Sequence, residues 1–132
     1  MTAPVIERLR TRAQFLAVRT GARVSRPTLV VEAKRRTADG PIGLGLTASR
    51  KVGGAVVRNR ARRRLRAAAR QLLPKHGLPG VDYVLVARQA APEAPWGALL
   101  DDLQNALIRL AAALQSGDPK PPKHAPKRPS RK

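Results

Sequence analysis

The chain has 132 residues and a formal net charge of +19, from 27 Lys and Arg against 8 Asp and Glu. It has no cysteine, which excludes disulfide frameworks and thiolate–zinc sites, and no apolar run approaches the ~20 residues of a membrane-spanning helix. The length favours a single domain, and the charge favours a polyanionic partner.

The first expected element is a short helix from Thr11 to Arg19, with Gly21 as its C-terminal cap. The residues before it include Glu7 and Arg8 and no apolar stretch, so no signal peptide is expected. Together with the absence of cysteine, this favours a location in the reducing cytoplasm.

Three strands are expected next. Residues 28–36 alternate between apolar and polar side chains, as in a half-exposed strand. An Asp-Gly-Pro turn at residues 39–41 leads into a second strand over residues 42–48, and residues 22–25 are expected to add an edge strand. A small sheet is therefore predicted ahead of the most charged part of the chain.

A basic amphipathic helix is expected over residues 54–73, ending at Pro74. Apolar side chains recur at helical spacing along residues 57–72, whereas six arginines fall within residues 58–66. Guanidinium groups match phosphate oxygens bidentately and remain charged. Because no acidic residue lies between residues 39 and 82 to neutralise them, a merely solvated face is disfavoured and nucleic acid is the expected partner.

The candidate nucleic-acid contacts lie on this helix and on the turn before it. They are Ser49, Arg50, Lys51, Arg58, Asn59, Arg60, Arg62, Arg63 and Arg66. Arg60 and Arg64 point away from the main arginine row, and packing along the sheet is the alternative role for both. The turn at residues 49–51 precedes a helix N-terminus, which favours a phosphate or an RNA-associated metal ion there; a solvated turn is the alternative.

The remaining elements complete a two-layer fold. Residues 81–87 are almost continuously apolar, as in a buried central strand. After a proline-containing link at residues 91–95, six leucines between Leu99 and Leu114 mark the buried face of a final helix. The order α-β-β-β-α-β-α predicts an α+β sandwich with helices on one sheet of about four strands.

The folded domain is predicted to span residues 1–116, followed by a disordered tail over residues 117–132. The tail is rich in proline and has no apolar periodicity, so it cannot bury enough surface to offset its conformational entropy. Its six basic residues less one aspartate account for +5 of the net charge, which leaves +14 on the domain. The basic character therefore belongs to the domain itself.

Residues 49–60 read Ser-Arg-Lys-Val-Gly-Gly-Ala-Val-Val-Arg-Asn-Arg and resemble the signature of the bacterial ribonuclease P protein family. Residues 14–18 resemble that family's first-helix motif, and residues 43–46 and 82–88 resemble the strands on either side of the signature. The similarity covers roughly residues 7–114. A lone Arg-Asn-Arg would be a weak signal, but a match along a twelve-residue segment with suitable flanking elements is a specific one.

The resemblance implies a compact α+β domain in which the basic helix joins two parallel strands by a left-handed crossover, against the general rule for such connections. It also implies an endonuclease whose RNA subunit removes the 5′ leader from precursor tRNA, using Mg²⁺ held mainly by that RNA. The protein would bind the RNA subunit through the Arg-Asn-Arg region, one protein per RNA. It would hold the single-stranded leader in a cleft between the first helix and the sheet.

The expected leader cleft includes Phe15, Arg19 and Val31. Proteins of this family usually place more aromatic rings there, whereas Arg19 and Val31 stand here where rings are expected. Each base stacked on an aromatic ring gains on the order of 1–3 kcal/mol, so leader binding should depend on charge more than on stacking. Phe15 itself has two interpretations, as a stacking platform for a base or as the core anchor of the first helix.

The same residues also bear on three other possible functions. A stand-alone nuclease is disfavoured because His76 and His124 have no partners for a catalytic or metal site and no carboxylate cluster could hold two metal ions. A membrane-surface helix is disfavoured because mostly Ala and Val lie opposite the arginines. A structural RNA-binding protein of the ribosomal type is the alternative function, since it suits a basic helix and tail equally well.

Overall fold

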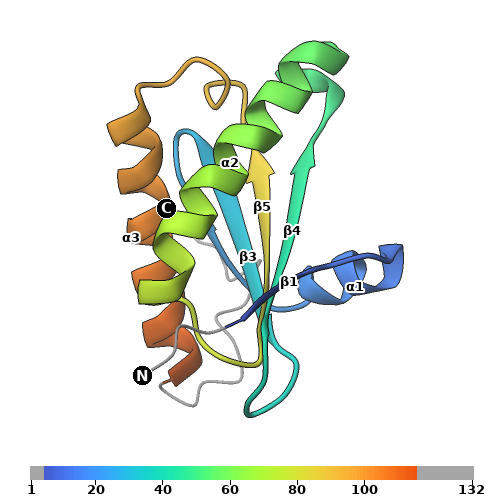
Figure 1. The fold of residues 1–132 in the computed structure, drawn as a ribbon, viewed down its shortest axis with the longest axis vertical. Helices are drawn as coiled ribbons and strands as arrows, with labels where there is room; N and C mark the ends of the chain where they lie inside the picture. The colour runs from blue at the N-terminus through green and yellow to red at the C-terminus, as the bar shows by residue number, and fades with distance from the viewer. Residues whose placement is uncertain (1–4, 116–132) are drawn as a thin grey trace, which may run out of the picture.

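The computed structural model describes residues 5–115 of the chain (Figure 1). Its elements are, in order, β1 (Ile6–Arg8), α1 (Arg12–Val18), β2 (Ala22–Ser25), β3 (Leu29–Arg35), β4 (Ile42–Ala48), the short 3₁₀ helix η1 (Arg50–Val52), α2 (Ala55–His76), β5 (Val81–Ala87) and α3 (Trp96–Gln115). The predicted tail at residues 117–132 lies outside the described residues, so the domain boundary stays a prediction.

The five strands form one mixed sheet in the order β1-β4-β5-β3-β2. β4 pairs in parallel with both β1 and β5, whereas β3 pairs antiparallel with β5 and β2. The α+β class and the central position of β5 are confirmed, but the sheet has one strand more than predicted. β1 was missed because its three residues, Ile6-Glu7-Arg8, are too few to show an alternating pattern.

The connection from β4 through α2 to β5 is left-handed, as the family resemblance implied. In Figure 1 α2 lies in front of the sheet, β4 and β5 both run upward, and the chain passes from β4 on the right to β5 on its left. A right-handed crossover would move to the right in this view. Sequence pattern alone favours the right-handed form, so this feature could only come from the resemblance.

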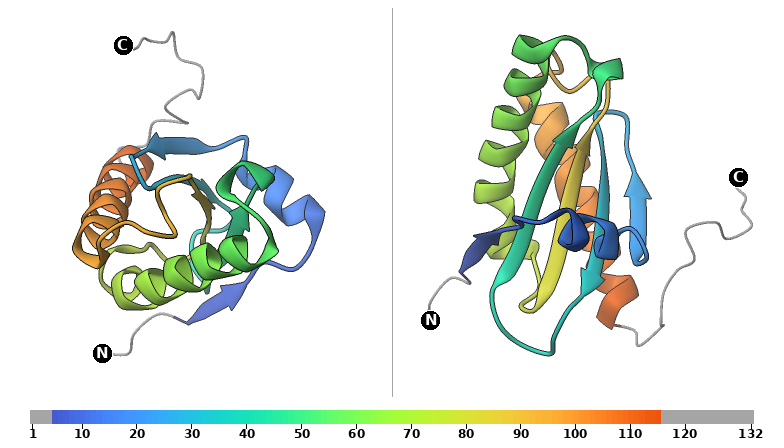
Figure 2. Two further views of the ribbon diagram at one scale, coloured as in Figure 1. Left: turned by 90° about the horizontal axis from the view of Figure 1, so that it is seen from above. Right: turned by 90° about the vertical axis from the view of Figure 1, so that its right-hand side faces the viewer.

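The two faces of the sheet are covered unequally (Figure 2). α2 and α3 pack on one face and enclose the main core, which includes the fully buried Leu29, Val31, Leu85 and Tyr83. The Tyr83 hydroxyl accepts a hydrogen bond from the Leu78 N–H at 3.0 Å, and burial raises its pKa. Among the described residues, the opposite face is covered only by the short helix α1, so part of the sheet remains accessible there.

The end of α1 differs from the prediction. The helix stops at Val18, and its C-terminal cap is Arg19 rather than Gly21. Gly21 is needed for a different reason, because a Cβ at this position would overlap the Ala33 carbonyl oxygen on β3. The glycine therefore serves the close approach of two chain segments and does not terminate the helix.

The end of α2 also differs from the prediction. The helix continues through Pro74 to His76, and the Gly77 N–H donates to the Leu73 carbonyl at 2.7 Å. Proline has a φ angle suited to a helix and removes only one backbone donor. In the last turn, where the ladder is about to end, that loss does not stop the helix.

A buried carboxylate on α3 fixes the connection between β2 and β3. Asp102 Oδ2 accepts hydrogen bonds from the Thr28 N–H at 3.0 Å and from the Thr28 hydroxyl at 2.8 Å. Arg26 Nε lies 3.5 Å from Asp102 Oδ1, and the Asp102 side chain is only 11% exposed. Two segments 74 residues apart are thus joined by one side chain.

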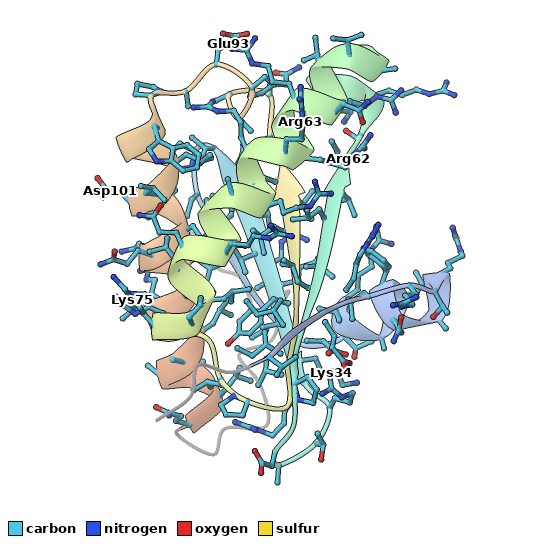
Figure 3. All side chains as sticks on the ribbon, viewed as in Figure 1. Lys34, Arg62, Arg63, Lys75, Glu93 and Asp101 are labelled. Carbon is cyan, nitrogen blue, oxygen red and sulfur yellow. The ribbon has the colours of Figure 1, made fainter. Side chains whose placement is uncertain are left out.

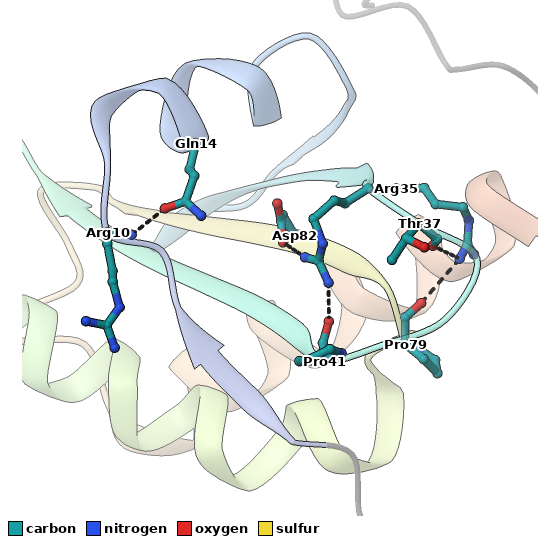
Figure 4. A network of polar contacts seen from close by, with 8 residues as sticks. Arg10, Gln14, Arg35, Thr37, Pro41, Pro79 and Asp82 are labelled. Atoms are coloured by element: carbon teal, nitrogen blue, oxygen red, sulfur yellow. Dashed lines mark hydrogen bonds and ion pairs between the residues drawn. The ribbon is translucent and has the colours of Figure 1, made fainter.

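Some of the positive charge is used inside the fold. Arg36 forms an ion pair with Asp82 and donates to the Pro41 carbonyl at 2.8 Å. Arg35 donates to the Pro79 carbonyl at 3.2 Å (Figure 4). These contacts hold the turn between β3 and β4 against the start of β5. Not every arginine is therefore available to an external partner.

Candidate nucleic-acid interface

The basic helix α2 has the predicted division into a buried and an exposed side. Its buried residues are Ala61, Leu65, Ala68, Ala69, Leu72 and Leu73. Val57 was predicted on the buried stripe but is exposed, because the first turns of α2 rise beyond the ends of β4 and β5 (Figure 1). Arg58, Arg62 and Arg66 recur every four residues and are partly exposed, so they share one face of α2 that is not part of its buried side.

Few of these arginines are neutralised within the protein. Four ion pairs join described residues: Arg23–Glu32, Arg26–Asp102, Arg36–Asp82 and Arg60–Glu93. On α2, only Arg60 has such a partner within residues 5–115, and this pair is exposed on both sides at 3.7 Å. Arg62 donates to the Asn59 side chain at 2.8 Å. Figure 3 shows Arg62 and Arg63 on the half of α2 that is distant from Lys75.

Arg64 has a structural role. Its guanidinium donates to the carbonyls of Ala91 and Ala94, both at 2.6 Å, and lies over the Trp96 ring at 5.8 Å from the centroid. The predicted alternative was packing along the sheet, and the observed contacts are instead with the link that leads into α3. Arg60 contacts Glu93 on the same link, so these two arginines differ from the others on the helix.

Two hydrogen bonds that involve side chains help to hold the turn before α2 in place. Ser49 Oγ accepts from the Lys51 N–H at 3.3 Å, and the Gln89 side chain donates to the Lys51 carbonyl at 2.9 Å. Gly54, the N-terminal cap of α2, makes no side-chain hydrogen bond. The side chains of Ser49, Arg50 and Lys51 are exposed at the surface, and their contact with a phosphate or metal ion stays a prediction.

A groove of about 840 Å³ lies between α1 and the open face of the sheet. Phe15 and Arg19 line it, together with Glu32 from β3 and Val84 and Val86 from β5. A second hollow of about 740 Å³ shares Arg23, Ser49 and Val86 with it and extends to Lys51, Arg88 and Gln89. The open face of the sheet thus forms one long depression, which we call the leader groove after the cleft that the family resemblance implies.

The prediction that Val31 lines this groove is wrong. Val31 is 0% exposed and belongs to the core beneath α2 and α3. Side chains alternate between the two faces of a strand, so Val31 shares the helix-covered face with Leu29 and Ala33. Its neighbour Glu32 faces the groove instead.

Phe15 anchors the first helix on a small core cluster, and its role as a stacking platform stays a prediction. It packs against the small cluster formed by Leu9, Val18 and Val84, and it also lines the groove. The ring lies directly on the β4 backbone, because a Cβ at Gly45 would come within 2.5 Å of it.

The groove carries more positive charge than the sequence prediction included. Arg10, Arg12 and Arg23 line it in addition to Arg19, and its single carboxylate, Glu32, is paired with Arg23 at 3.4 Å. Arg23 lies opposite Glu32 in the β2–β3 register, a relation that a hairpin alignment of the two strands could have found. Within residues 5–115, no helix combines the length and apolar character needed to cross a membrane.

The start of α1 fixes where these arginines lie. Thr11 caps the helix, and the Gln14 side chain accepts from the Thr11 backbone N–H at 2.9 Å. The Gln14 side chain also accepts from the Arg10 backbone N–H at 2.6 Å (Figure 4). This reciprocal capping box sets the direction of the chain as it enters α1. Arg10 and Arg12 are therefore held at the mouth of the groove by backbone geometry.

Comparisons with known proteins identify relatives over most of the chain. A sequence model of the family described as Ribonuclease P matches residues 4–111. The ribonuclease P protein component of Caulobacter vibrioides is 48% identical over 115 residues, covering 86% of this chain and 77% of the relative. That of Ruegeria pomeroyi is 47% identical, covering 79% and 86%. The solved RNase P protein of Thermotoga maritima has a TM-score of 0.67 at 28% identity, covering 78% and 96%.

Proposed function

The chain belongs to the ribonuclease P protein family, and from that premise we propose that α2 binds the RNase P RNA while the leader groove binds the 5′ leader of precursor tRNA. The family supplies the protein subunit of an RNA-catalysed endonuclease that takes part in 5′ leader processing of tRNA. The alternative of a ribosomal structural protein is not favoured. We further propose one protein per RNA, acting in the cytoplasm.

The observation that carries the RNA assignment is the group of α2 arginines that have no carboxylate partner. Arg58, Arg62, Arg63 and Arg66 have no carboxylate within 4.0 Å among the described residues. Like charges so close together repel, and an anionic partner relieves the repulsion. Guanidinium groups fixed on a helix bind phosphates with little loss of side-chain freedom, which suits a folded RNA backbone.

Replacing Arg62 by alanine is expected to weaken binding to the RNase P RNA by about 1–3 kcal/mol, because it removes a charge-assisted contact. The matched change is Lys75→Ala, which removes the same charge at the far end of the same helix (Figure 3) and should have little effect. Filter binding or calorimetry at several salt concentrations measures both. Equal losses for the two variants would show that only net charge matters and would contradict the assignment.

The leader assignment is supported by the shape and charge of the groove. It is long and open, and it presents the arginines at positions 10, 12, 19 and 23 with Phe15 as its only aromatic ring. A strand bound there would be held through its phosphates, with little recognition of base edges. Affinity for precursor tRNA is therefore expected to exceed that for mature tRNA without strong dependence on leader sequence.

The gain in affinity is expected to rise over the first few leader nucleotides and then level off, because further phosphates would lie beyond the groove. Phe15→Ala should remove about 1 kcal/mol of this gain, the lower end of the range for one stacked base. Raising the salt concentration should reduce it in both proteins. Precursor affinity measured against leader length tests this, and a gain that does not vary with leader length would rule out the groove.

The RNA subunit is a better candidate for binding Mg²⁺ than this protein is. Within residues 5–115 no three His, Cys, Asp or Glu side chains come together in a way that could hold a metal ion. The few carboxylates are mostly engaged with arginine, as in the Arg36–Asp82 pair. We therefore assign Mg²⁺ mainly to the RNA subunit, and the protein contributes positive charge and shape.

A further inference from the structure

A separate cavity of about 400 Å³ lies on the far side of Phe15 from the leader groove, at the edge of the sheet. We call it the edge groove. Arginines from two elements surround it, Arg8 at the end of β1 and Arg62, Arg66 and Arg70 on α2. Apolar groups form its floor, among them Phe15 and Leu46. Neither Arg8 nor Arg70 belongs to the predicted RNA contacts.

The floor of the edge groove is an unpaired strand edge. β1 pairs with β4 only over residues 42–44, and the Leu9 N–H makes the last contact, with the Leu44 carbonyl at 2.9 Å. From Gly45 onward, no strand within residues 5–115 pairs with β4 on this side. Gly45 itself is buried beneath the Phe15 ring, whereas Leu46, Thr47 and Ala48 are partly exposed along this edge.

The charge around the edge groove is not compensated within the described part of the chain. No carboxylate lies within 4.0 Å of Arg8, Arg62, Arg66 or Arg70 there. The three α2 arginines follow one another at intervals of four residues, which is about 6 Å along a helix axis. Such a row presents several donors to consecutive phosphates rather than to one isolated anion.

We propose that the edge groove is a nucleotide-binding site that takes one unstacked base of the RNase P RNA. The base packs against Phe15 and Leu46, and its flanking phosphates are bound by Arg8, Arg66 and Arg70. This inference rests on the proposed function of α2 and adds a specific pocket to it. An apolar floor beneath fixed cations fits a base with its phosphates better than it fits phosphate alone.

An acidic peptide added to the β4 edge is the competing occupant. Such strand addition relies on a ladder of backbone hydrogen bonds. The free edge spans only residues 45–48, which allows a very short ladder, while four guanidinium groups face the cavity. Because the guanidinium groups offer more contacts than the short strand edge, a nucleic acid is favoured over an added peptide strand.

The two grooves can be tested separately because they share a single side chain. Phe15 lines both, whereas Arg19 lines only the leader groove and Arg70 only the edge groove. A change at Phe15 therefore affects both sites, and changes at the two arginines separate them. Arg109, which is exposed on α3 and lines neither groove, provides a control for the loss of one positive charge.

The binding experiment uses the full chain with the trinucleotide UUU and a trimer of the same backbone that lacks bases, observed by NMR of the leucine methyl groups. UUU is expected to shift the Leu46 methyl resonances and to bind several-fold more tightly than the abasic trimer, because only UUU stacks on Phe15. Arg70→Ala should weaken UUU binding at Leu46 by about five- to tenfold, the effect of one charge-assisted phosphate contact. Arg109→Ala and Arg19→Ala should change it less than twofold.

Three results would overturn the proposal. Equal binding of UUU and the abasic trimer would mean that no base enters the pocket. Equal losses for Arg70→Ala and Arg109→Ala would mean that net charge alone is responsible. Tighter binding of a hexaglutamate peptide than of UUU, with the same sensitivity to Arg70→Ala, would make an acidic peptide the occupant.

A reconstitution experiment separates failure of the edge groove from failure of the proposed function. Arg70→Ala should weaken assembly with the RNase P RNA and leave the dependence on leader length intact, and Arg19→Ala should do the reverse. If Arg62→Ala weakens assembly but Arg70→Ala does not, the edge groove fails and the α2 assignment stands. If neither variant weakens assembly, the assignment of α2 to the RNA fails as well.

Discussion

Replacing Asp102 by alanine is expected to lower the free energy of unfolding by about 3–5 kcal/mol, because the change leaves buried partners without their carboxylate. The Thr28 N–H and hydroxyl would lose hydrogen bonds of 3.0 and 2.8 Å, and Arg26 would lose its counter-charge. Small domains have a total stability of about 5–15 kcal/mol, so this one side chain supports a large share of it.

The neighbouring residue provides the control. Asp101 is exposed on the same helix, and Asp101→Ala should change stability by no more than about 0.5 kcal/mol. Urea denaturation followed by the fluorescence of Trp96, the only tryptophan, measures both variants. Similar small effects at the two positions would show that water replaces the carboxylate at Thr28 and that the tie between α3 and the β2–β3 connection contributes little.

Arg64→Ala is expected to destabilise the domain by about 2–4 kcal/mol while leaving RNA affinity nearly unchanged. The substitution removes two charge-assisted hydrogen bonds to the Ala91 and Ala94 carbonyls and the contact with the Trp96 ring. Because these groups hold the link into α3, the loss should appear in unfolding, and in a changed Trp96 emission in the folded state.

The adjacent arginine should behave in the opposite way. Arg63 is exposed and makes no ion pair within the described residues, so Arg63→Ala should leave stability within about 0.5 kcal/mol and weaken RNA binding about tenfold. The pair is tested by denaturation and by RNA binding on the same two proteins. If both variants lose RNA affinity equally and neither loses stability, the division of α2 into structural and RNA-facing arginines is wrong.

Most of the fold could be predicted from local pattern. The leucine face of α3, the apolar run of β5 and the stripe of α2 are strong because each is long and buried. β1 could not be predicted, because its identity as a strand comes from its partner β4 and not from its own three residues. The end of α2 was placed too early because proline is a poor guide to termination in a final turn.

The candidate site was predictable in its residue types and less so in its geometry. The arginines of α2 were identified from charge density, but the different role of Arg64 depends on the path of the link before α3. The prediction for Val31 was wrong because it came from the family resemblance. The alternation of side chains along its own strand places Val31 on the buried face of the sheet. Arg10 and Arg12 were missed because their placement depends on the capping box of α1.

The central position of β5 has a consequence for the order of events during synthesis. β5 joins β3 to β4, yet it ends at Ala87, so no continuous sheet can exist until two thirds of the 132-residue chain has been made. Until then the emerging chain exposes α2, with its unneutralised arginines, before β5 and α3 are present to pack against it. Domains built on such distant pairings gain their contacts late and fold slowly. In this state the nascent chain is not yet folded and carries a large positive charge. Surrounding RNA can therefore bind α2 before the sheet packs against it.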